Sequence, residues 1–276
     1  MAVTKILITV KTYPTLSAKY DELVCTAGFK EDGTWVRIYP VSFRKRAYNE
    51  QYKKYDWIEL DLVKNTSDFR PESYRPHSDD SEIKIIGHID TKDNWAERKT
   101  IALGKVYRNL SELIAEAKDK NIRTSLAVFK PASVKEFRIE AVDRNWDKDK
   151  LAKLQQMNLF QTASDDKFEV VQKLPFKFSY LFTDNQGTES KMMIEDWEIG
   201  QLYWNCLAKH EGDEAKACAD VKNKYFDDFA KSKDLHLFLG TTQLHHHVSH
   251  NPFMIIGTFH PKVETPKMAP IQTSLF

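Results

Sequence analysis

Two acidic residues with catalytic potential stand close together in the segment Glu195-Asp196-Trp197-Glu198, where an expected strand passes into an expected helix. Carboxylates at such a junction can activate a water molecule or stabilise a developing sugar cation. Acidic residues also favour helix N-termini, because they cap free backbone amides there. We interpret Asp196 as the candidate catalytic carboxylate and Glu198 as the second choice, with helix capping as the alternative.

A second group of candidate catalytic residues lies on an expected hairpin. Asp184 follows the strand 176–183, and Glu189 and Lys191 lie on the strand 189–194. This layout resembles the Asp…Glu-x-Lys arrangement of metal-dependent restriction-type nucleases, in which two carboxylates hold Mg²⁺ and the lysine assists the attacking water. A magnesium site at Asp184, Glu189 and Lys191 is therefore the alternative to a reaction that needs no cofactor.

Four histidines, His245, His246, His247 and His250, precede the last expected strand. Zinc needs three or four ligands on a rigid frame, and successive rings of an extended run point in different directions. The spacing therefore favours loop residues over a metal centre. One histidine of this group, for which we take His247, is a candidate to contact phosphate or to support a leaving base.

Basic and aromatic residues alternate between residues 35 and 55. Six Lys or Arg residues face a single acid, Glu50, which gives a local charge of +5. Cations bind phosphates and aromatic rings stack on exposed bases, whereas the alternative is a solvated loop with half-buried rings. From this stretch and its flanks we take as candidate nucleic-acid-binding residues Lys11, Tyr13, Arg37, Tyr39, Arg44, Lys45, Arg46, Arg70, Tyr74 and Arg75.

The composition is that of a folded, charge-balanced protein. The chain has 276 residues, 41 Lys plus Arg, 40 Asp plus Glu and 41% hydrophobic residues, which excludes a disordered chain or a polycation. No apolar run approaches the roughly 20 residues that cross a bilayer, so we expect no membrane partner. Cys25, Cys206 and Cys218 show no C-x-x-C spacing, which favours a reduced, cytoplasmic protein.

The elements that must position these residues change in character along the chain. The first part shows the alternation and turn signals of strands, expected at residues 4–11, 23–29, 35–41, 57–63 and 83–89. The second part mixes both types, with helices expected at 111–120, 147–160, 196–207 and 213–230 and strands at 137–142, 176–183, 189–194, 235–239 and 253–259.

These patterns predict an α+β protein. We expect a β-rich nucleic-acid-binding part at residues 1–100, folded as a small barrel or bent sheet. A mixed α/β part with the candidate active site follows at 101–260, and residues 261–276 form a flexible tail.

Five segments of the chain resemble a bacterial family of hypothetical proteins of about this length. They are Lys-Thr-Tyr-Pro at 11–14, residues 19–28, Trp-Val-Arg-Ile-Tyr-Pro-Val at 35–41, Arg-Pro-Glu-Ser at 70–73 and Asp-Trp-Glu at 196–198. The resemblance implies that these segments belong together, and it brings no activity. Some members carry a Cys-x-x-Cys before Asp-Trp-Glu; this sequence has none, so no zinc site carries over.

The last five residues, Gln-Thr-Ser-Leu-Phe at 272–276, resemble the sliding-clamp-binding peptide of bacterial DNA polymerases and repair proteins. Leu275 and Phe276 fit an apolar pocket and the Gln272 amide fits its rim. A similar peptide occurs at 156–160, where Leu159 and Phe160 are also suited to end a core helix. The resemblance implies the replication sliding clamp as a partner, and a tail docked on the protein itself is the alternative.

Together these features favour a protein that acts on DNA. The leading hypothesis is a DNA glycosylase that removes a modified base, in repair or in defence against phage, because base excision needs one carboxylate or histidine and no metal. A metal-dependent nuclease is the first alternative. A non-enzymatic reader of modified nucleic acid is the second.

Overall fold

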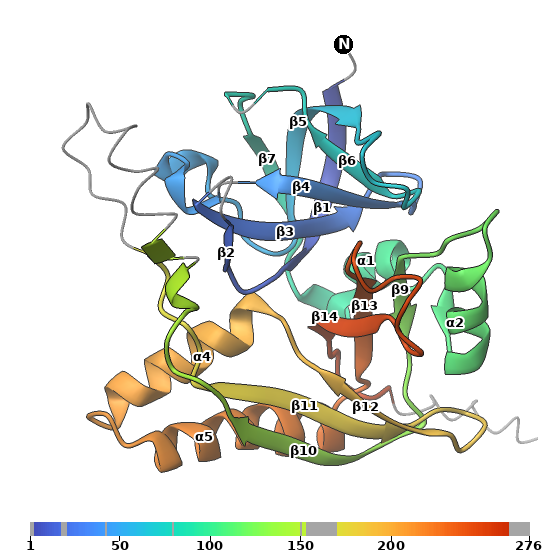
Figure 1. The fold of residues 1–276 in the computed structure, drawn as a ribbon. Coiled ribbons are helices and arrows are strands. Elements are labelled where there is room, and N and C mark those ends of the chain that lie inside the picture. Colours follow the sequence, from blue (N-terminus) through green and yellow to red (C-terminus); the bar gives the residue numbers. More distant parts are fainter. Residues whose placement is uncertain are drawn as a thin grey trace, which may run out of the picture.

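The computed structural model gives the arrangement shown in Figure 1. It describes residues 3–17, 21–41, 43–78, 80–149, 151–152 and 170–264. The peptide at 156–160, the C-terminal peptide with Gln272, Leu275 and Phe276, and most of the helix expected at 147–160 lie outside these residues.

The first part of the chain forms a closed barrel, drawn at the top of Figure 1. Its strands lie side by side in the order β1 (Val3–Lys11), β3 (Asp21–Phe29), β4 (Trp35–Val41), β6 (Ser73–Pro76) and β5 (Asp56–Lys64). β5 pairs back with β1 and closes the ring. β4 and β6 are parallel, and the other neighbours are antiparallel. This five-stranded Greek-key order is that of the OB fold.

Strand alternation fills the inside of this barrel. Ile6 and Ile8 of β1 point inward with Val36 and Ile38 of β4 and Ile58 of β5, and all five are buried. The residues between them point outward, because successive side chains of a strand face opposite sides. Smaller elements complete this half: β2 (Thr15–Ser17), the short 3-10 helices η1 (Phe43–Lys45) and η2 (Tyr48–Glu50), and β7 (Lys84–His88).

The second part of the chain repeats this strand order. β9 (Leu126–Phe129) and β10 (Ser133–Ala141) act as one bent strand, followed by β11 (Phe176–Thr183), β12 (Glu189–Met193), β13 (His236–Thr241) and β14 (Phe253–Phe259). β10 pairs with β11 and β11 with β12, and a parallel bridge between Ile194 and Ile255 joins the end of β12 to β14. β14 pairs with β13 and β13 with β9, which closes a second barrel of OB order.

Helical segments connect and cover the two barrels. In both barrels a helical segment lies between the third and fourth strands; in the second it consists of α4 (Trp197–Lys209), α5 (Glu214–Lys222) and the π-helix η3 (Asn223–Ala230). Between the barrels the chain forms α1 (Lys92–Ala102), β8 (Val106–Tyr107) and α2 (Leu110–Lys118). No helix of the described residues has the length and hydrophobicity to span a membrane.

The two barrels pack against each other along a broad apolar contact. Ala127 and Phe129 of β9 face the core of the second barrel. Leu126 and Val128 face the opposite way and belong to a cluster with residues on the outside of the first barrel, such as Phe29. The sheet of β9, β13 and β14 is thus buried on both faces, and it covers the outer face of β1, β3 and β4.

The predicted fold class is confirmed: a β-rich, barrel-forming N-terminal part precedes a mixed α/β part. One helix boundary differs from the prediction. The helix expected at 111–120 is α2, which begins at Leu110 because the Asn109 side chain caps it by accepting hydrogen bonds from the backbone amides of Ser111 and Glu112. The helix α1 and the strand β9 were not predicted.

Candidate functional site

A pocket of about 500 Å³ lies where the two barrels meet. Its walls come from β1, the turn before β5, β7 and α1 of the first half, and from α4, η3 and the end of β14 in the second half. The backbone places β1 against α4, because Thr12 bridges Asp196 and the Tyr13 amide donates to the Glu195 carbonyl at 3.0 Å. Lys11 therefore lies beside the first turn of α4.

Two buried cations line this pocket without a salt bridge to a described carboxylate. Carboxylates attract them only from beyond ion-pair distance, Glu198 and Asp196 acting on Lys11 and Asp90 and Glu198 on Arg98. Lys11 is 9% exposed and Arg98 is 6% exposed. The Lys11 Nζ donates to the Tyr52 carbonyl at 3.1 Å, and the Arg98 Nε and Nη2 donate to the Ile89 carbonyl at 2.9 and 2.6 Å. Neither forms an ion pair within the part of the chain that the structure describes. Buried charges in proteins are normally paired, so this pocket is suited to an anion.

Aromatic rings partly stabilise the two cations. The Lys11 Nζ lies 4.5 Å from the ring centre of Phe43 and 5.3 Å from that of Trp197. The Arg98 guanidinium lies 3.6 Å from the ring centre of Tyr55. Burial and, next, the Lys54 ammonium lower the pKa of Lys11 to about 8, so it is mostly protonated at pH 7.

Lys54 connects the candidate carboxylates at the rim of the pocket. Its Nζ donates to both oxygens of Asp196 at 2.8 Å and to Glu198 at 2.9 Å. Burial alone would lower the pKa of Lys54, but the two carboxylates more than reverse this and raise it. Burial would raise the pKa of Glu198, and Lys54 instead lowers it. Lys54 is thus a protonated ammonium between two carboxylates.

The two predicted catalytic acids differ in their access to the pocket. Asp196 is fully buried, caps α4 by accepting from the Glu198 amide at 3.2 Å, and does not line the pocket. Burial raises the pKa of its carboxyl to about 6, against the effect of Lys54. Glu198 lines the pocket and its side chain is 51% exposed. Asp196 therefore has the capping role, and Glu198 is the acid that a ligand can reach.

Two aromatic walls of the pocket are held by unusual backbone conformations. Tyr55 has a φ of 68°, and Asp93, Asn94 and Trp95 form a left-handed turn at the start of α1, with φ of 47°, 52° and 66°. Such conformations cost roughly 1–2 kcal/mol for each residue other than glycine, and they cluster at functional sites. The strain therefore marks the part of the pocket that Tyr55 and Trp95 form.

His260 completes this end of the pocket. Its ring stacks on Phe229 of the π-helix at 3.6 Å and meets Trp95 edge-on at 5.0 Å. Burial lowers its pKa to about 4, so the imidazole is neutral at pH 7. The predicted histidine, His247, lies elsewhere: it stacks on Phe69 at 4.7 Å and does not line this pocket. Sequence reasoning missed His260, Trp95 and Arg98, because each stands outside a recognisable motif.

The prediction that Arg37 and Arg70 face a nucleic acid is wrong. Arg37 is 2% exposed, and it donates to Ser125 in the second barrel. Arg70 is 6% exposed; it pairs with Asp68 at 2.6 Å and also donates to the Thr241 carbonyl. Both guanidiniums donate hydrogen bonds to residues of the second half of the chain, Ser125 and Thr241, and so hold the barrels together.

The other predicted nucleic-acid-binding residues differ in how far they are exposed. Tyr13 is buried, with its hydroxyl donating to the Gln172 carbonyl at 2.7 Å and accepting from the Trp204 indole at 2.8 Å, which makes it a packing residue instead of a base-stacking one. The remaining residues whose side chains are described are partly or fully exposed, namely Tyr39, Arg44, Arg46, Tyr74 and Arg75. The Lys45 side chain lies outside the described part. Lys11 alone of the predicted set lines the central pocket.

The residues of the alternative magnesium site, Asp184, Glu189 and Lys191, are engaged in other contacts. Asp184 is 2% exposed and accepts hydrogen bonds from the amides of Leu110, Gln186 and Thr188. Glu189 pairs with Lys135 and Lys191 with Glu140 on the surface. Among the described residues no group of three or more His, Cys, Asp or Glu side chains is placed to hold a metal ion.

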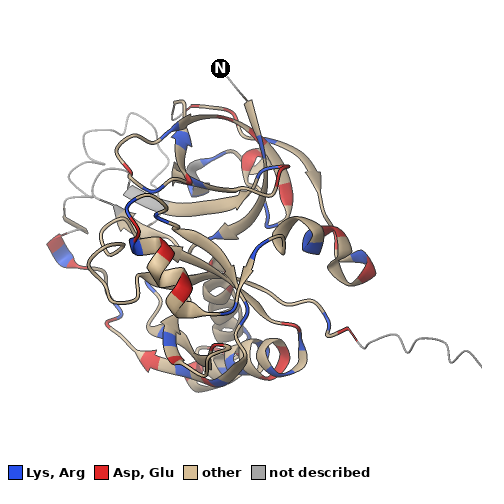
Figure 2. Cartoon of the chain, turned by 90° about the vertical axis from the view of Figure 1, so that its right-hand side faces the viewer, with Lys and Arg blue, Asp and Glu red and all other residues tan. Residues whose placement is uncertain are grey.

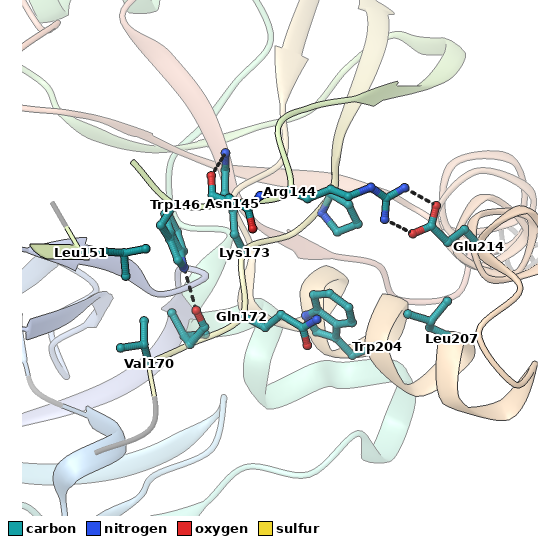
Figure 3. Close-up of a pocket in the computed structure, with 12 residues that line it drawn as sticks. Arg144, Asn145, Trp146, Leu151, Val170, Gln172, Lys173, Trp204, Leu207 and Glu214 are labelled. Atoms are coloured by element: carbon teal, nitrogen blue, oxygen red, sulfur yellow. Dashed lines mark hydrogen bonds and ion pairs between the residues drawn. The ribbon is translucent and has the colours of Figure 1, made fainter. Parts of the chain in front are cut away.

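A second pocket, of about 600 Å³, lies beside α4 (Figure 3). Its polar groups bind one another: Arg144 forms a two-fold hydrogen-bonded pair with Glu214, and the Trp146 indole donates to the Val171 carbonyl at 2.7 Å. Lys173 donates to the Asn145 carbonyl at 3.0 Å. Arg144 has a carboxylate partner, whereas Lys173 has none among the described residues but is only partly buried. This pocket therefore lacks the buried unpaired cations found between the barrels.

Charges on the rest of the molecule are mixed in sign. In Figure 2, Lys and Arg alternate with Asp and Glu over both halves of the chain. Many of them form surface ion pairs, for example Lys5 with Glu31 at 2.7 Å and Lys224 with Asp228 at 2.7 Å. The pocket between the barrels is therefore distinguished by unpaired buried cations and not by a general excess of charge.

Comparisons with known proteins give a family and no assigned activity. No curated protein matches the chain. Similar solved structures include a murine DNA-binding protein bound with double-stranded DNA, at 9% identity over 98% of this chain and 100% of that one, with a TM-score of 0.33. Another is tetrameric p202 HIN2, at 8% identity over 95% and 92%, with a TM-score of 0.31. Similarity at this level is too low to establish a common fold.

The family models divide the chain between its two barrels. A domain of unknown function, DUF8758, matches residues 2–104, which contain the first barrel. A second, DUF8757, matches residues 107–276, which contain the second barrel and make up more than half of the sequence. The chain belongs to the DUF8757 family.

Proposed function

We propose that this protein binds DNA through the pocket between its two barrels, with Lys11 and Arg98 contacting phosphate and the aromatic walls contacting a base. The observation that carries the proposal is the pair of buried cations that share one pocket and lack carboxylate partners. A charge without a counter-charge is unfavourable inside a protein. An anionic ligand supplies the missing charge.

The chemistry of the walls narrows the class of anion. Tyr55, Trp95, Trp197 and Phe229 contribute rings to the same pocket as the cations. Aromatic faces stack on bases, and lysine and arginine bind phosphate, so a nucleotide satisfies both kinds of wall. The volume of about 500 Å³ also lies within the usual range for small-ligand pockets.

The arrangement of the two carboxylates favours DNA binding without catalysis over hydrolysis. Asp196 is shielded from the pocket, and Lys54 holds both acids in one ion-pair network. A general base works best when a proton of a bound water can reach it. The proposed function is therefore that of a DNA-binding reader without catalysis. It is a form of the second alternative drawn from the sequence, a non-enzymatic reader of modified nucleic acid.

Glycosidic hydrolysis is a second candidate because of one observation. Glu198 lines the pocket, and Lys54 lowers its pKa, so an ionised carboxylate faces the site where a sugar would lie. In that case DNA with a modified base acquires alkali-labile sites on incubation with the protein, EDTA has no effect, and Glu198→Gln abolishes the reaction while DNA binding persists. Absence of such sites on every DNA tested leaves the reader function alone.

The binding proposal is tested by fluorescence anisotropy with labelled single-stranded DNA, double-stranded DNA and RNA of one sequence. The double variant Lys11→Gln with Arg98→Gln is expected to lose at least about tenfold in affinity, or about 1.4 kcal/mol. A matched control removes two exposed lysines instead, Lys84 and Lys222, by Lys84→Gln with Lys222→Gln. Equal affinity of the pocket and control variants overturns the proposal, and tighter binding of RNA corrects its choice of DNA.

A further inference from the structure

We infer that the pocket takes a terminal phosphate monoester of a nucleotide, carried by a free mononucleotide or by the phosphorylated end of a strand, and that it excludes an internal nucleotide. This inference rests on the proposed function, which it narrows from nucleic acid in general to one chemical group. Three observations support it. The cations of the pocket are buried, the second barrel covers the outer face of β3 and β4, and the pocket carries more positive than negative charge.

The cations lie inside the pocket, so the phosphate must also go inside. Lys11 and Arg98 are 9% and 6% exposed, and the Lys54 side chain is 4% exposed. When a nucleotide is flipped out of a strand, its base enters the protein while its phosphates stay at the rim with the backbone. A phosphate that reaches side chains buried to this degree must not continue into chain on both sides. Only a strand end or a free nucleotide meets that condition.

The path that a strand would follow across the first of the two OB barrels is covered. OB barrels bind oligonucleotides on the face of their second and third strands and on the adjoining loops. Here those strands are β3 and β4, and Phe29 on their outer face packs against Phe238 of the second barrel with ring centres 6.3 Å apart. The loop after β5 is held as well, because Gln243 donates to the Ser67 carbonyl at 2.8 Å. A continuous strand has no route over this face.

The charge of a monoester matches the two unpaired cations. A phosphate monoester carries about −1.5 to −2 charges at pH 7, whereas an internal diester carries one. The lining carries four cations, Lys11, Lys53, Lys54 and Arg98, and one carboxylate, Glu198. Asp196, which pairs with Lys54, adds a second carboxylate, so four positive charges face two negative ones. Arg98 also presents its Nη1, which donates no hydrogen bond to any described residue, and arginine binds phosphate oxygens through paired donors.

The experiment compares ligands that differ only in their ends. One short single-stranded DNA is prepared with a 5′-phosphate, with a 3′-phosphate, with hydroxyls at both ends, and ligated into a circle without ends; deoxynucleoside monophosphates are added as competitors. One of the two phosphorylated strands is expected to bind at least about tenfold more tightly than the hydroxyl strand, or about 1.4 kcal/mol. The circle is expected not to compete.

The outcomes separate this inference from the proposed function. If the circle competes as well as the phosphorylated strand, the inference is wrong while DNA binding stands; if no DNA and no nucleotide binds, both fail. Competition by the monophosphates assigns the site to a free nucleotide, and its absence assigns it to a strand end. Lys11→Gln with Arg98→Gln is expected to abolish the preference for phosphate, and the control Lys84→Gln with Lys222→Gln to retain it. If the variant Lys11→Gln with Arg98→Gln still prefers the phosphorylated strand, the phosphate binds elsewhere and the inference is wrong.

Discussion

Arg37 and Ser125 join the two barrels through hydrogen bonds that are fully enclosed. The Arg37 Nη1 donates to the Ser125 hydroxyl at 2.6 Å, and its Nη2 donates to the Ser125 carbonyl at 3.0 Å. The Ser125 hydroxyl in turn donates to the Glu72 carboxylate at 2.7 Å. A basic residue of β4 thus fixes the second barrel on the face where OB barrels bind their ligands.

Replacement of Arg37 is expected to loosen this contact. Arg37→Gln leaves Ser125 and Glu72 without their buried cation, so we expect the free energy of unfolding to fall by about 3 kcal/mol. Urea denaturation measures the loss. Arg75→Gln is the matched control, because Arg75 is exposed and its substitution is expected to stay within about 0.5 kcal/mol of the parent. Equal stability of the two variants would contradict a joining role for Arg37.

Lys11→Met is expected to stabilise the protein while it weakens ligand binding. The pKa of Lys11 falls from 10.5 to about 8 in the folded state. The protonated lysine therefore opposes folding below pH 8, and this penalty is relieved between pH 8 and 10.5. At ~1.4 kcal/mol per pKa unit the penalty at pH 7 is about 3 kcal/mol, and loss of the hydrogen bond to Tyr52 reduces the expected gain to about 2 kcal/mol.

Denaturation of the Lys11→Met variant and of the parent at pH 7 and at pH 10 tests whether the substitution raises the free energy of unfolding. The advantage of the variant should shrink as pH rises, because the parent lysine becomes neutral in the folded state first. A variant that is less stable than the parent at pH 7 would show that the Lys11 cation is already neutralised in the free protein.

Ligand affinity is expected to fall as the pH rises through the pKa of Lys11. Since that pKa is about 8 in the free protein, the charged form decreases about tenfold between pH 7 and pH 9, and affinity for a phosphate-bearing ligand should decrease by up to the same factor. Lys11→Arg supplies a cation that stays protonated over this range. Titration calorimetry at both pH values should show a flat profile for the arginine variant; a flat profile for the parent would exclude Lys11 as a phosphate contact.

The clamp-binding resemblance of the last five residues makes an independent prediction. Deletion of 272–276 is expected to abolish pull-down by the sliding clamp, since it removes Gln272, Leu275 and Phe276 together, and to leave ligand affinity of the pocket unchanged. If pull-down persists after the deletion and also after Leu159→Ala with Phe160→Ala, the clamp is not a partner through either peptide.

The strands were predictable because their signals are local. Alternating residues such as Ile6 and Ile8 in β1 reveal a half-buried strand by period alone, and the α4 cap at Asp196 follows from one residue type at a helix start. The closure of each barrel was not predictable. It depends on pairings such as β1 with β5 and β13 with β9, which join residues far apart in sequence.

The site was only half predictable for the same reason. Lys11, Asp196 and Glu198 stood in segments with recognisable composition, so sequence alone drew attention to them. Arg98 and His260 reach the pocket from α1 and from the end of β14, and only the docking of the two barrels brings them together. The error at Arg37 has the matching cause: sequence shows that a residue is basic, but not which face of the barrel a neighbouring domain covers.

The two carboxylates that share Lys54 should differ in their contribution to stability. Asp196→Asn keeps a good helix cap, because asparagine caps as well as aspartate does, but it leaves the buried Lys54 with one partly exposed partner. We expect a loss of about 3 kcal/mol in the free energy of unfolding. Glu198→Gln keeps the fully buried pair of Lys54 and Asp196, and because its side chain is 51% exposed we expect a loss of at most about 1 kcal/mol. Urea denaturation of both variants gives the comparison, and a larger loss in Glu198→Gln would show that Glu198, and not Asp196, is the principal partner of Lys54.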